Sequence, residues 1–283
     1  MKTRTLSQLE KATVEMVGAN KVLQALPTRN LKQVDPFLLI HHLVPVDVQS
    51  GASIRIPPHP HAGFEVVTYL LDGEFFHRDS LGNDQIAKGG DINWMTSGSG
   101  IIHSEGPTEN FLKHGGRLQL LQIWINLPAK DKFLAPGFRH YDSSSFPVLD
   151  NGEAWLKVLI GKYKNLQADP IHQTPMFAYH LKLKKGMSFV LDVDQRQTSA
   201  VYLMQGKVDI QDEVLKSGQL GNFNLDGDQL EFLAEEDSEL FIFGGLPIKE
   251  KVVSYGPFVM NSFEDIQKSI TNYEKGKMGQ LSY

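Results

Sequence analysis

Short segments of alternating hydrophobic and polar residues, separated by turn-forming residues, fill most of the chain. Between Ile54 and about Leu127, strand-like runs cover residues 65–71, 74–77, 90–95 and 118–127. Turn signals lie between them at Asp72-Gly73, Leu81-Gly82-Asn83 and Lys88-Gly89-Gly90. Many short strands at close spacing are typical of an all-β sandwich or barrel and not of alternating strands and helices.

A second set of strands is predicted from about Ala154 to Gly245, after a proline-bounded segment, 129–137, that indicates a linker or short helix. The two sets share a weak repeat. Residues 69–75 (YLLDGEF) resemble residues 202–208 (YLMQGKV), an offset of 133 positions (206 minus 73), and a glycine-containing stretch follows each copy. We therefore expect two β domains, residues 1–130 and 131–283.

Two further elements are predicted outside these sets. Residues 34–40 indicate a turn and a buried strand, and His41 and His42 follow it. Because adjacent strand residues point to opposite faces, at most one of this pair could join a site, and a structural role is favoured for both. Near the C-terminus, apolar residues recur with helical period over 263–273, with Ser262 as the candidate N-cap and Asp265 in the place of a capping-box acid.

Composition narrows the class of protein. The chain has 283 residues, of which 41% are hydrophobic and 22% charged, so a folded core is expected. A net charge of -5 without a run of basic residues disfavours direct binding to nucleic acid. The absence of Cys excludes disulfides, thiolate ligands and a Cys nucleophile. The sequence contains neither a signal-peptide core nor ~18 consecutive apolar residues, so we expect a cytoplasmic protein without a membrane span.

The candidate chemistry lies in two short stretches about forty residues apart. His59 and His61 are two positions apart, as are His103 and Glu105. In extended strands, residues i and i+2 point to the same face, so each pair projects into one space. Two such strands facing each other would offer three imidazole nitrogens and one carboxylate oxygen to a single ion. This donor set suits Fe(II), Mn(II), Ni(II), Co(II) or Zn(II), and it contains too much nitrogen for Mg(II) or Ca(II).

A structural explanation of the same residues stays open. Pro57, Pro58 and Pro60 could hold His59 and His61 on an exposed extended edge, and Glu105 could be a solvent-facing acid. His77 and the other histidines after it, apart from His103, have no partner at ligand spacing and are left unassigned.

The order of these motifs resembles that of a known family. Residues 59–65 (HPHAGFE), Gly73, Gly90, Gly98 and His103 are similar to the two motifs of the cupin superfamily. More narrowly, the chain resembles the pirin family of two-cupin proteins, in the stretches 35–39 (DPFLL), 59–65, 94–98 (WMTSG), 100–105 (GIIHSE) and 256–261 (GPFVMN).

That resemblance implies two cupin barrels packed face to face, with a metal only in the N-terminal one. It implies iron, Fe(II), as the cofactor, with Ni, Co, Mn, Cu or Zn as alternatives, and His59, His61, His103 and Glu105 as the metal ligands. Glu65, a ligand in many other cupins, is usually not one in pirins. Because it lies four residues after His61, we expect it on the same face, in a role around the ligands or toward a substrate.

The resemblance also implies an activity. Some pirins cleave flavonols such as quercetin with O2, so we expect a dioxygenase that takes a small aromatic flavonol or catechol, with Glu105 accepting the proton of a substrate hydroxyl. The alternative is a non-catalytic, iron-dependent regulatory protein, because animal pirins are described as transcriptional co-regulators. A Zn(II) or Mn(II) cupin isomerase is a third reading. We expect a monomer, for which a protein partner remains open.

Overall fold

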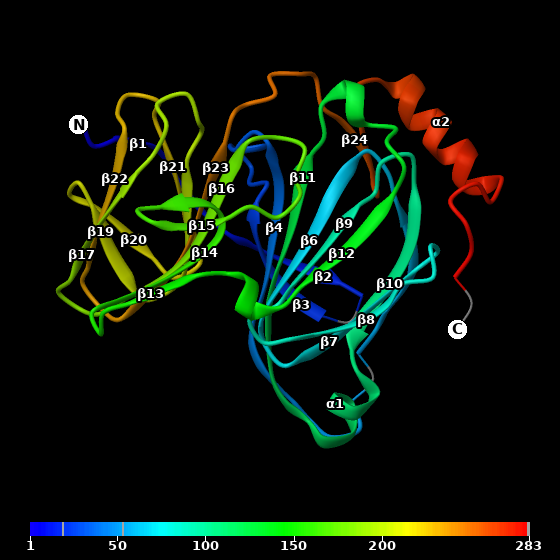
Figure 1. Ribbon diagram of the computed structural model, residues 1–283, viewed down its shortest axis with the longest axis horizontal. Coiled ribbons are helices and arrows are strands. Elements are labelled where there is room, and N and C mark those ends of the chain that lie inside the picture. Colours follow the sequence, from blue (N-terminus) through cyan, green and yellow to red (C-terminus); the bar gives the residue numbers. More distant parts are fainter. Residues whose placement is uncertain (19, 53, 282–283) are drawn as a thin grey trace. The chain divides into compact units, whose positions relative to one another are not determined.

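The computed structural model describes residues 1–18, 20–52 and 54–281. Regular structure is mostly β-strand, which confirms the all-β prediction (Figure 1). Helices of the described residues are α1 (Glu109–His114), α2 (Phe263–Glu274) and the one-turn 3-10 helices η1 (Ala129–Asp131) and η2 (Ser143–Ser145). In this part of the chain, no helix is long and apolar enough to cross a membrane.

The chain divides into two compact units, each assembled from segments that are distant in sequence. The 39–143 unit contains Leu39–Ser143, Val14–Val22 and the C-terminal residues from Lys249 on. The 144–248 unit contains Ser144–Ile248, Met1–Thr13 and Leu23–Leu38. These units differ from the division at residue 130 that the sequence suggests, because each end of the chain associates with the unit that lies farther away in sequence.

Two sheets build the 39–143 unit, although residues 13, 23–26 and 37–38 of the larger sheet are grouped with the other unit. The larger has the strand order β12-β9-β6-β11-β4-β3-β2, with the bounds Gly137–Tyr141, Ile92–Thr96, Phe64–Asp72, Gly116–Asn126, Phe37–Val48, Asn20–Leu26 and Thr13–Val17. The smaller has the order β5-β10-β7-β8, with the bounds Ile56–His61, Ile101–Pro107, Glu74–Asp79 and Asp84–Lys88.

The inner faces of these two sheets meet and enclose the interior of the unit. In an antiparallel pair, directly opposite residues point to the same face. Thr68 of β6 lies opposite Gln122 of β11, and both side chains hydrogen-bond to Glu105 of the smaller sheet. Phe138 of β12 stacks on His77 of β7 with ring centroids 4.0 Å apart. Polar side chains are thus brought into a barrel interior that is otherwise largely apolar.

Two sheets also build the 144–248 unit. One follows the order β1-β21-β18-β23-β16-β14-β13, with β15 paired to β14 and the bounds Leu6–Lys11, Gln219–Phe223, Ala200–Gln205, Ser238–Gly245, Met176–Leu183, Ala154–Tyr163, Val148–Asp150 and, for β15, Leu166–Ala168. The other follows β17-β22-β19-β20, with the bounds Ser188–Asp192, Gln229–Ala234, Lys207–Ile210 and Glu213–Lys216. Aromatic pairs such as Tyr163 with Phe189 fill the space between the sheets.

The N-terminal residues are fixed in the 144–248 unit by a buried arginine. The guanidinium of Arg4 donates hydrogen bonds to the carbonyls of Gly227, Gln197 and Asp194 and to Ser199 Oγ, at 2.7–2.9 Å. Strand β1, which follows it, pairs antiparallel with β21. Because a buried guanidinium needs many acceptors, these contacts explain why the N-terminal strand lies here and not in the 39–143 unit.

The repeat seen in the sequence corresponds to equivalent turns in the two units. Gly73 joins β6 to β7 with φ +100, and Gly206 joins β18 to β19 with φ +94. A side chain at either position would be strained, and a Cβ on Gly206 would lie 2.4 Å from Ser238 Oγ. The offset of 133 positions therefore reflects a common turn geometry.

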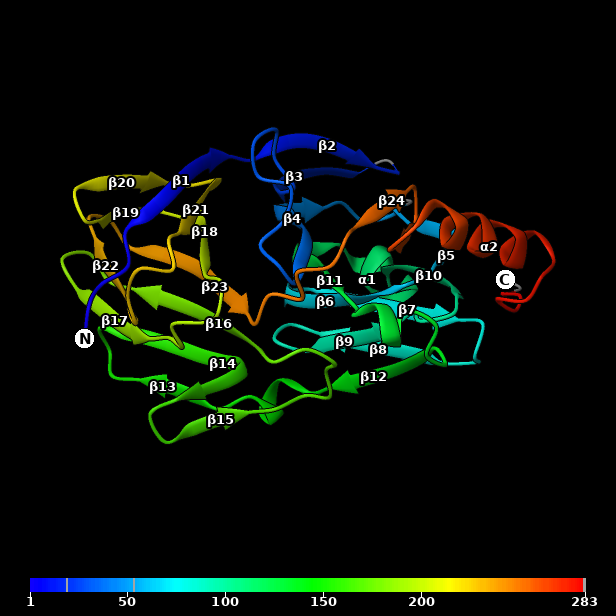
Figure 2. The ribbon, with the colours of Figure 1, turned by 90° about the horizontal axis from the view of Figure 1, so that it is seen from above.

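Helix α2 begins as predicted. Ser262 is the N-cap, its hydroxyl accepts a hydrogen bond from Asp265 N at 3.1 Å, and it donates one to the Asp265 carboxylate at 2.7 Å. The helix packs through Ile266 in an apolar cluster with Phe258 and Met260. Figure 2 shows α2 and β24 (Val253–Tyr255), orange to red, beside β5 of the 39–143 unit; β25 (Phe258–Met260) pairs with β24.

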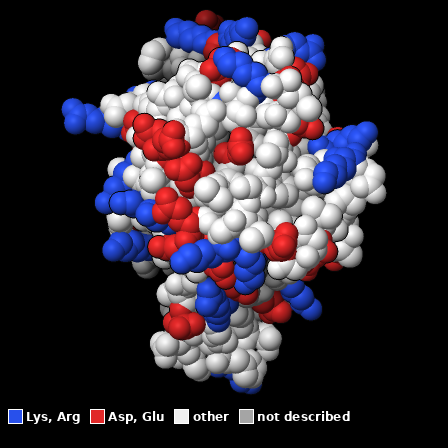
Figure 3. Space-filling view, turned by 90° about the vertical axis from the view of Figure 1, so that its left-hand side faces the viewer, with Lys and Arg blue, Asp and Glu red and all other residues white. Residues whose placement is uncertain are grey.

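Surface charge is mixed. On the face shown in Figure 3, Lys and Arg side chains lie among Asp and Glu side chains without forming a broad field of one sign. Together with the net charge of -5, this face offers no basic surface of the kind that binds nucleic acid.

Candidate metal centre

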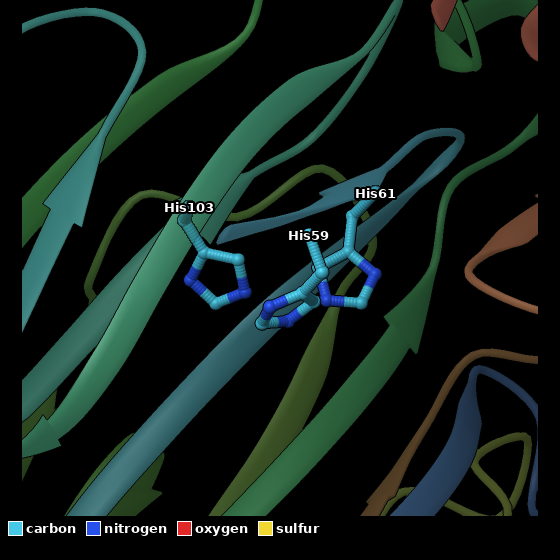
Figure 4. A group of neighbouring side chains, drawn as sticks. All are labelled: His59, His61 and His103. Atoms are coloured by element: carbon cyan, nitrogen blue, oxygen red, sulfur yellow. The ribbon is translucent and has the colours of Figure 1, made fainter. Parts of the chain in front are cut away.

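Three of the predicted ligands meet on the inner face of the smaller sheet. His59 and His61 belong to β5, His103 belongs to β10, and the antiparallel pairing places His103 opposite His59. The ring centroids of His103 lie 4.3 Å from His59 and 5.0 Å from His61, and one nitrogen of each ring lies within 4.8 Å of the others (Figure 4). The alternation of strand side chains thus produces the grouping expected from the sequence.

Burial keeps two of the three rings, those of His61 and His103, neutral. Burial lowers the pKa of His61 to about 3, with His59 adding to the effect, and burial also lowers the pKa of His103 far below its usual value. The Nδ1 atoms of His59 and His61 lie 2.8 and 3.4 Å from the carbonyl oxygens of Pro57 and Pro257. A carbonyl only accepts, so Nδ1 donates in both rings and Nε2 is the nitrogen that could bind an ion.

A divalent metal ion fits this arrangement. Both ring nitrogens of His103 are buried, and neither has a hydrogen-bond partner in the described structure. A buried polar group left unpaired costs about 1–3 kcal/mol, and an ion bound to one nitrogen would offset that cost. Ligating histidines also commonly donate their second N–H to a carbonyl, as His59 and His61 do here.

Glu105, the fourth predicted ligand, lies outside the group of three. The register of β10 on β5 shifts between His103 and Glu105, so Glu105 pairs with Ile56. The carboxylate is buried and accepts hydrogen bonds from Gln122 Nε2 and, at 3.4 Å, from Thr68 Oγ1. Strand alternation therefore groups the histidines, while Glu105 as a fourth ligand stays a prediction.

A further histidine of the interior, His77, was not identified from the sequence. It lies on β7 opposite Glu105, and its ring centroid is 5.4 Å from that of His103. Its Nε2 is 2.9 Å from Asp79 Oδ2. Asp79 also accepts hydrogen bonds from Leu81 N and from the backbone and side chain of Asn83. The period-two spacing of His77 and Asp79 was the available signal, because it resembles that of the other two pairs.

Glu65 does not share the face of His61, so that expectation is wrong. Gly63, with φ +87, ends β5, and Glu65 begins a new strand, β6. In β6, Glu65 lies opposite Thr96, whose hydroxyl donates a hydrogen bond to the Glu65 carboxylate at 2.9 Å. Glu65 and Thr68 are three residues apart on this strand, so their side chains point to opposite faces of the sheet. Burial raises the pKa of Glu65 to about 7. It is a buried acid on the other side of the sheet from the histidines.

An open pocket has Glu105 in its lining, whereas His59, His61 and His103 do not line it. Its walls are mainly apolar, with Leu43, Phe75 and Leu120 among them, and its polar groups include Glu105, Gln122 and His41. Burial lowers the pKa of His41 to about 4, so this imidazole is neutral. His42 is hydrogen-bonded to Gln119 instead, in agreement with the prediction that at most one of the pair joins a site.

A second group of donor atoms, Asp91, His140 and Asp142, is satisfied by the protein itself. Asp91 accepts hydrogen bonds from the backbone N–H groups of Ser143 and Lys88, and His140 Nδ1 pairs with Asn93 Oδ1. His140 Nε2 lies 3.7 Å from the Asp91 carboxylate and 3.6 Å from that of Asp142. Unlike His103, this group has no unpaired buried nitrogen, and we assign it no ligand.

Comparison with known proteins agrees with this architecture. A family model described as Pirin matches residues 19–125, and one described as Pirin C-terminal cupin domain matches residues 178–279. A Pseudomonas aeruginosa protein named "Putative quercetin 2,3-dioxygenase" is 34% identical over 249 residues, which cover 87% of each chain. Pirin of Mus musculus is 32% identical, with 97% of this chain and 93% of that one covered.

Solved structures show the same fold. A crystal structure of quercetin 2,3-dioxygenase from Acinetobacter baumannii has a TM-score of 0.94 at 29% identity and covers 99% of this chain and 100% of that one. Bacterial pirin YhhW from Escherichia coli, in complex with nickel(II), has a TM-score of 0.64 at 22% identity, with 85% and 99% covered. The chain therefore belongs to the pirin family and has its two-cupin fold.

Proposed function

We propose that this chain is a metal-dependent dioxygenase that cleaves a flavonol such as quercetin, with its active centre in the 39–143 unit. The observation that carries the proposal is the convergence of His59, His61 and His103 in a unit that also has an apolar-walled pocket lined by Glu105. Relatives named as quercetin 2,3-dioxygenases support the substrate class.

His59, His61 and His103 would hold the ion, with Glu105, two residues after His103 on β10, as the fourth ligand. Fe(II) is the preferred ion, and Ni, Co, Mn, Cu and Zn also suit the donor set. Bound there, a redox-capable metal would supply Lewis acidity toward a substrate oxygen and reactivity toward O2.

The residues of the pocket would bind and orient the substrate. Apolar walls such as Phe75 and Leu120 suit a flat aromatic molecule and exclude water from its rings. Glu105, at the inner end, would accept the proton of a substrate hydroxyl, and Gln122 and Thr68 hold this carboxylate by hydrogen bonds. The pocket is our reason to favour an enzyme over a regulatory protein that binds iron without turnover, since regulation alone would not need it.

Elemental analysis followed by oxygen uptake with quercetin tests the proposal. We expect about one equivalent of a redox-active metal in the isolated protein and metal-dependent O2 consumption. His103→Ala should lose both, whereas His114→Ala, which changes an exposed histidine of α1, should keep both. Metal binding without oxygen uptake would favour the regulatory alternative. Absence of metal, even after anaerobic reconstitution with Fe(II), would refute the oxygenase.

A further inference from the structure

The C-terminal segment returns to the strand that carries His59 and His61. Val259 N donates to Ala62 O at 3.0 Å, and Ala62 N donates to Pro257 O at 3.4 Å. Ala62 and Phe258 thereby form a parallel bridge at the end of β5. Two stretches nearly two hundred residues apart in sequence are thus joined directly beside the candidate ligands.

The same segment contacts a candidate ligand. The Pro257 carbonyl that accepts from Ala62 also lies 3.4 Å from His61 Nδ1, and it is the hydrogen-bond partner that the structure gives this ring. Such a carbonyl fixes which nitrogen is protonated and in which plane the ring lies. The direction of the His61 lone pair therefore depends on where residue 257 is held.

A buried lysine fixes this junction. Lys132 is 2% exposed, and its ammonium donates to Gly63 O at 2.7 Å, to Val259 O at 3.0 Å and to Asn126 Oδ1. An ammonium has three donors, so its hydrogen-bonding capacity is used entirely on these three acceptors. Lys132 joins the turn after His61 to the C-terminal segment and to the end of β11.

Close packing leaves the junction little freedom. A Cβ on Gly63 would lie 2.0 Å from Val259 O, so the two backbones touch at a position that only glycine allows. Phe258, Met260 and Met278 form an apolar cluster with Ala62, and Ile102 packs against it from the neighbouring strand. Since Ile102 precedes His103, the cluster supports both metal-site strands.

We propose that the C-terminal segment 257–260 is part of the metal centre and that Lys132 is a positioning residue, which holds the Pro257 carbonyl on His61 through Gly63 and Val259. The inference rests on the proposed metal site. It assigns the orientation of one ligand, His61, to residues 257–260 and to Lys132, which does not bind the ion itself.

Titration with Co(II), followed by its visible absorption, tests this positioning role. Lys132→Met keeps the length and apolar stem of the side chain and removes its donors. We expect its affinity for Co(II) to fall 10–100-fold, with a changed ligand-field spectrum, because outer partners of ligating histidines have effects of this size. Lys130→Met is the matched control: that lysine lies in the same segment with an 81% exposed side chain, and it should bind as the wild type does.

The outcomes separate the two proposals. If the wild type binds Co(II) and Lys132→Met binds it with the same affinity and spectrum, the positioning role is wrong and the metal site stands. If the wild type binds no Co(II), both fall. If Lys132→Met does not fold, Phe258→Leu is tested in its place, because this substitution loosens β25 without removing a hydrogen-bond donor. Weaker Co(II) binding with a changed spectrum then supports the inference. Unchanged Co(II) binding overturns it.

Discussion

His103 lies directly opposite His59 in the pairing of β10 with β5, and their ring centroids are 4.3 Å apart. Because neither nitrogen of His103 has a partner among the described residues, we predict that its ring contributes to metal affinity and little to the stability of the metal-free fold. In His103→Ala, added Ni(II) should no longer raise the melting temperature. In the wild type, the ion at a hundred times its Kd should stabilise by about 2.7 kcal/mol.

Differential scanning fluorimetry with and without the ion measures this effect. His172→Ala is a suitable control, because His172 belongs to the other unit and its Nδ1 is paired with Pro170 O. A melting temperature that still rises with Ni(II) in His103→Ala, by as much as in the wild type, would place the ion elsewhere.

Glu105 should matter more for turnover than for binding. Its carboxylate lies at the pocket and is held by Gln122 and Thr68, so Glu105→Gln preserves the shape while removing the base. We predict a fall in kcat of about 100-fold or more with a smaller change in metal affinity, as for the loss of a general base. Steady-state oxygen uptake measures it, with the exposed Glu109→Gln as the control. Equal kcat in both variants would remove Glu105 from the mechanism.

The sequence predicts those parts of this centre that depend on the geometry of a single strand. The period of two in a strand was enough to group His59 with His61 and to place His103 among them. It does not reveal the register shift in β10 at Glu105, because that shift arises from pairing with another strand, and Glu105 as a ligand stays a prediction. It failed at Glu65, because the turn at Gly63 starts a new strand with its own faces.

The division of the chain into units could not be predicted for a related reason. Local pattern identified the strands and the N-cap of α2 at Ser262. Arg4 finds its acceptors about 190 to 223 residues away, and Phe258 reaches Ala62 across most of the chain. No local pattern of hydrophobic and polar residues encodes such contacts, since they depend on which buried donor meets which acceptor after the sheets have formed.

Asp79 should make the protein sensitive to acid. Burial opposes its ionisation, but hydrogen bonds from His77 and Asn83 outweigh burial and lower the pKa of Asp79 below its ordinary value. A carboxyl group with a lowered pKa stabilises the fold at neutral pH, and this contribution is lost as the pH falls below about 4 toward the folded-state pKa. Asp79→Asn should therefore cost about 1–3 kcal/mol at pH 7 and less at pH 3.

Urea denaturation followed by tryptophan fluorescence at pH 7, 4 and 3 compares the two proteins. Asp84→Asn, whose side chain is 60% exposed and paired with Arg78, serves as the control and should follow the wild type throughout. A stability difference between the wild type and Asp79→Asn that stays constant down to pH 3 would contradict the assignment of this shift to Asp79.

Lys132 should change the free energy of unfolding at neutral to alkaline pH, whereas Asp79 does so at acidic pH. Burial lowers the pKa of its ammonium from 10.5 to about 7, and the Glu250 carboxylate only partly opposes this. Between about pH 7 and 10.5 the unfolded chain therefore holds a proton that the folded chain releases, so the free energy of unfolding rises with pH across this window. Lys132→Met has no titrating amine and should lack that rise, while the three acceptors left without a donor make it less stable.

The stability lost in Lys132→Met should consequently grow from pH 6 to pH 9, which urea denaturation at several pH values measures directly. Lys130→Met should show the pH dependence of the wild type, because its side chain is exposed. A deficit of the same size at pH 6 and pH 9 would mean that Lys132 keeps its proton in the folded protein, held by the carbonyls of Gly63 and Val259 strongly enough to cancel the effect of burial.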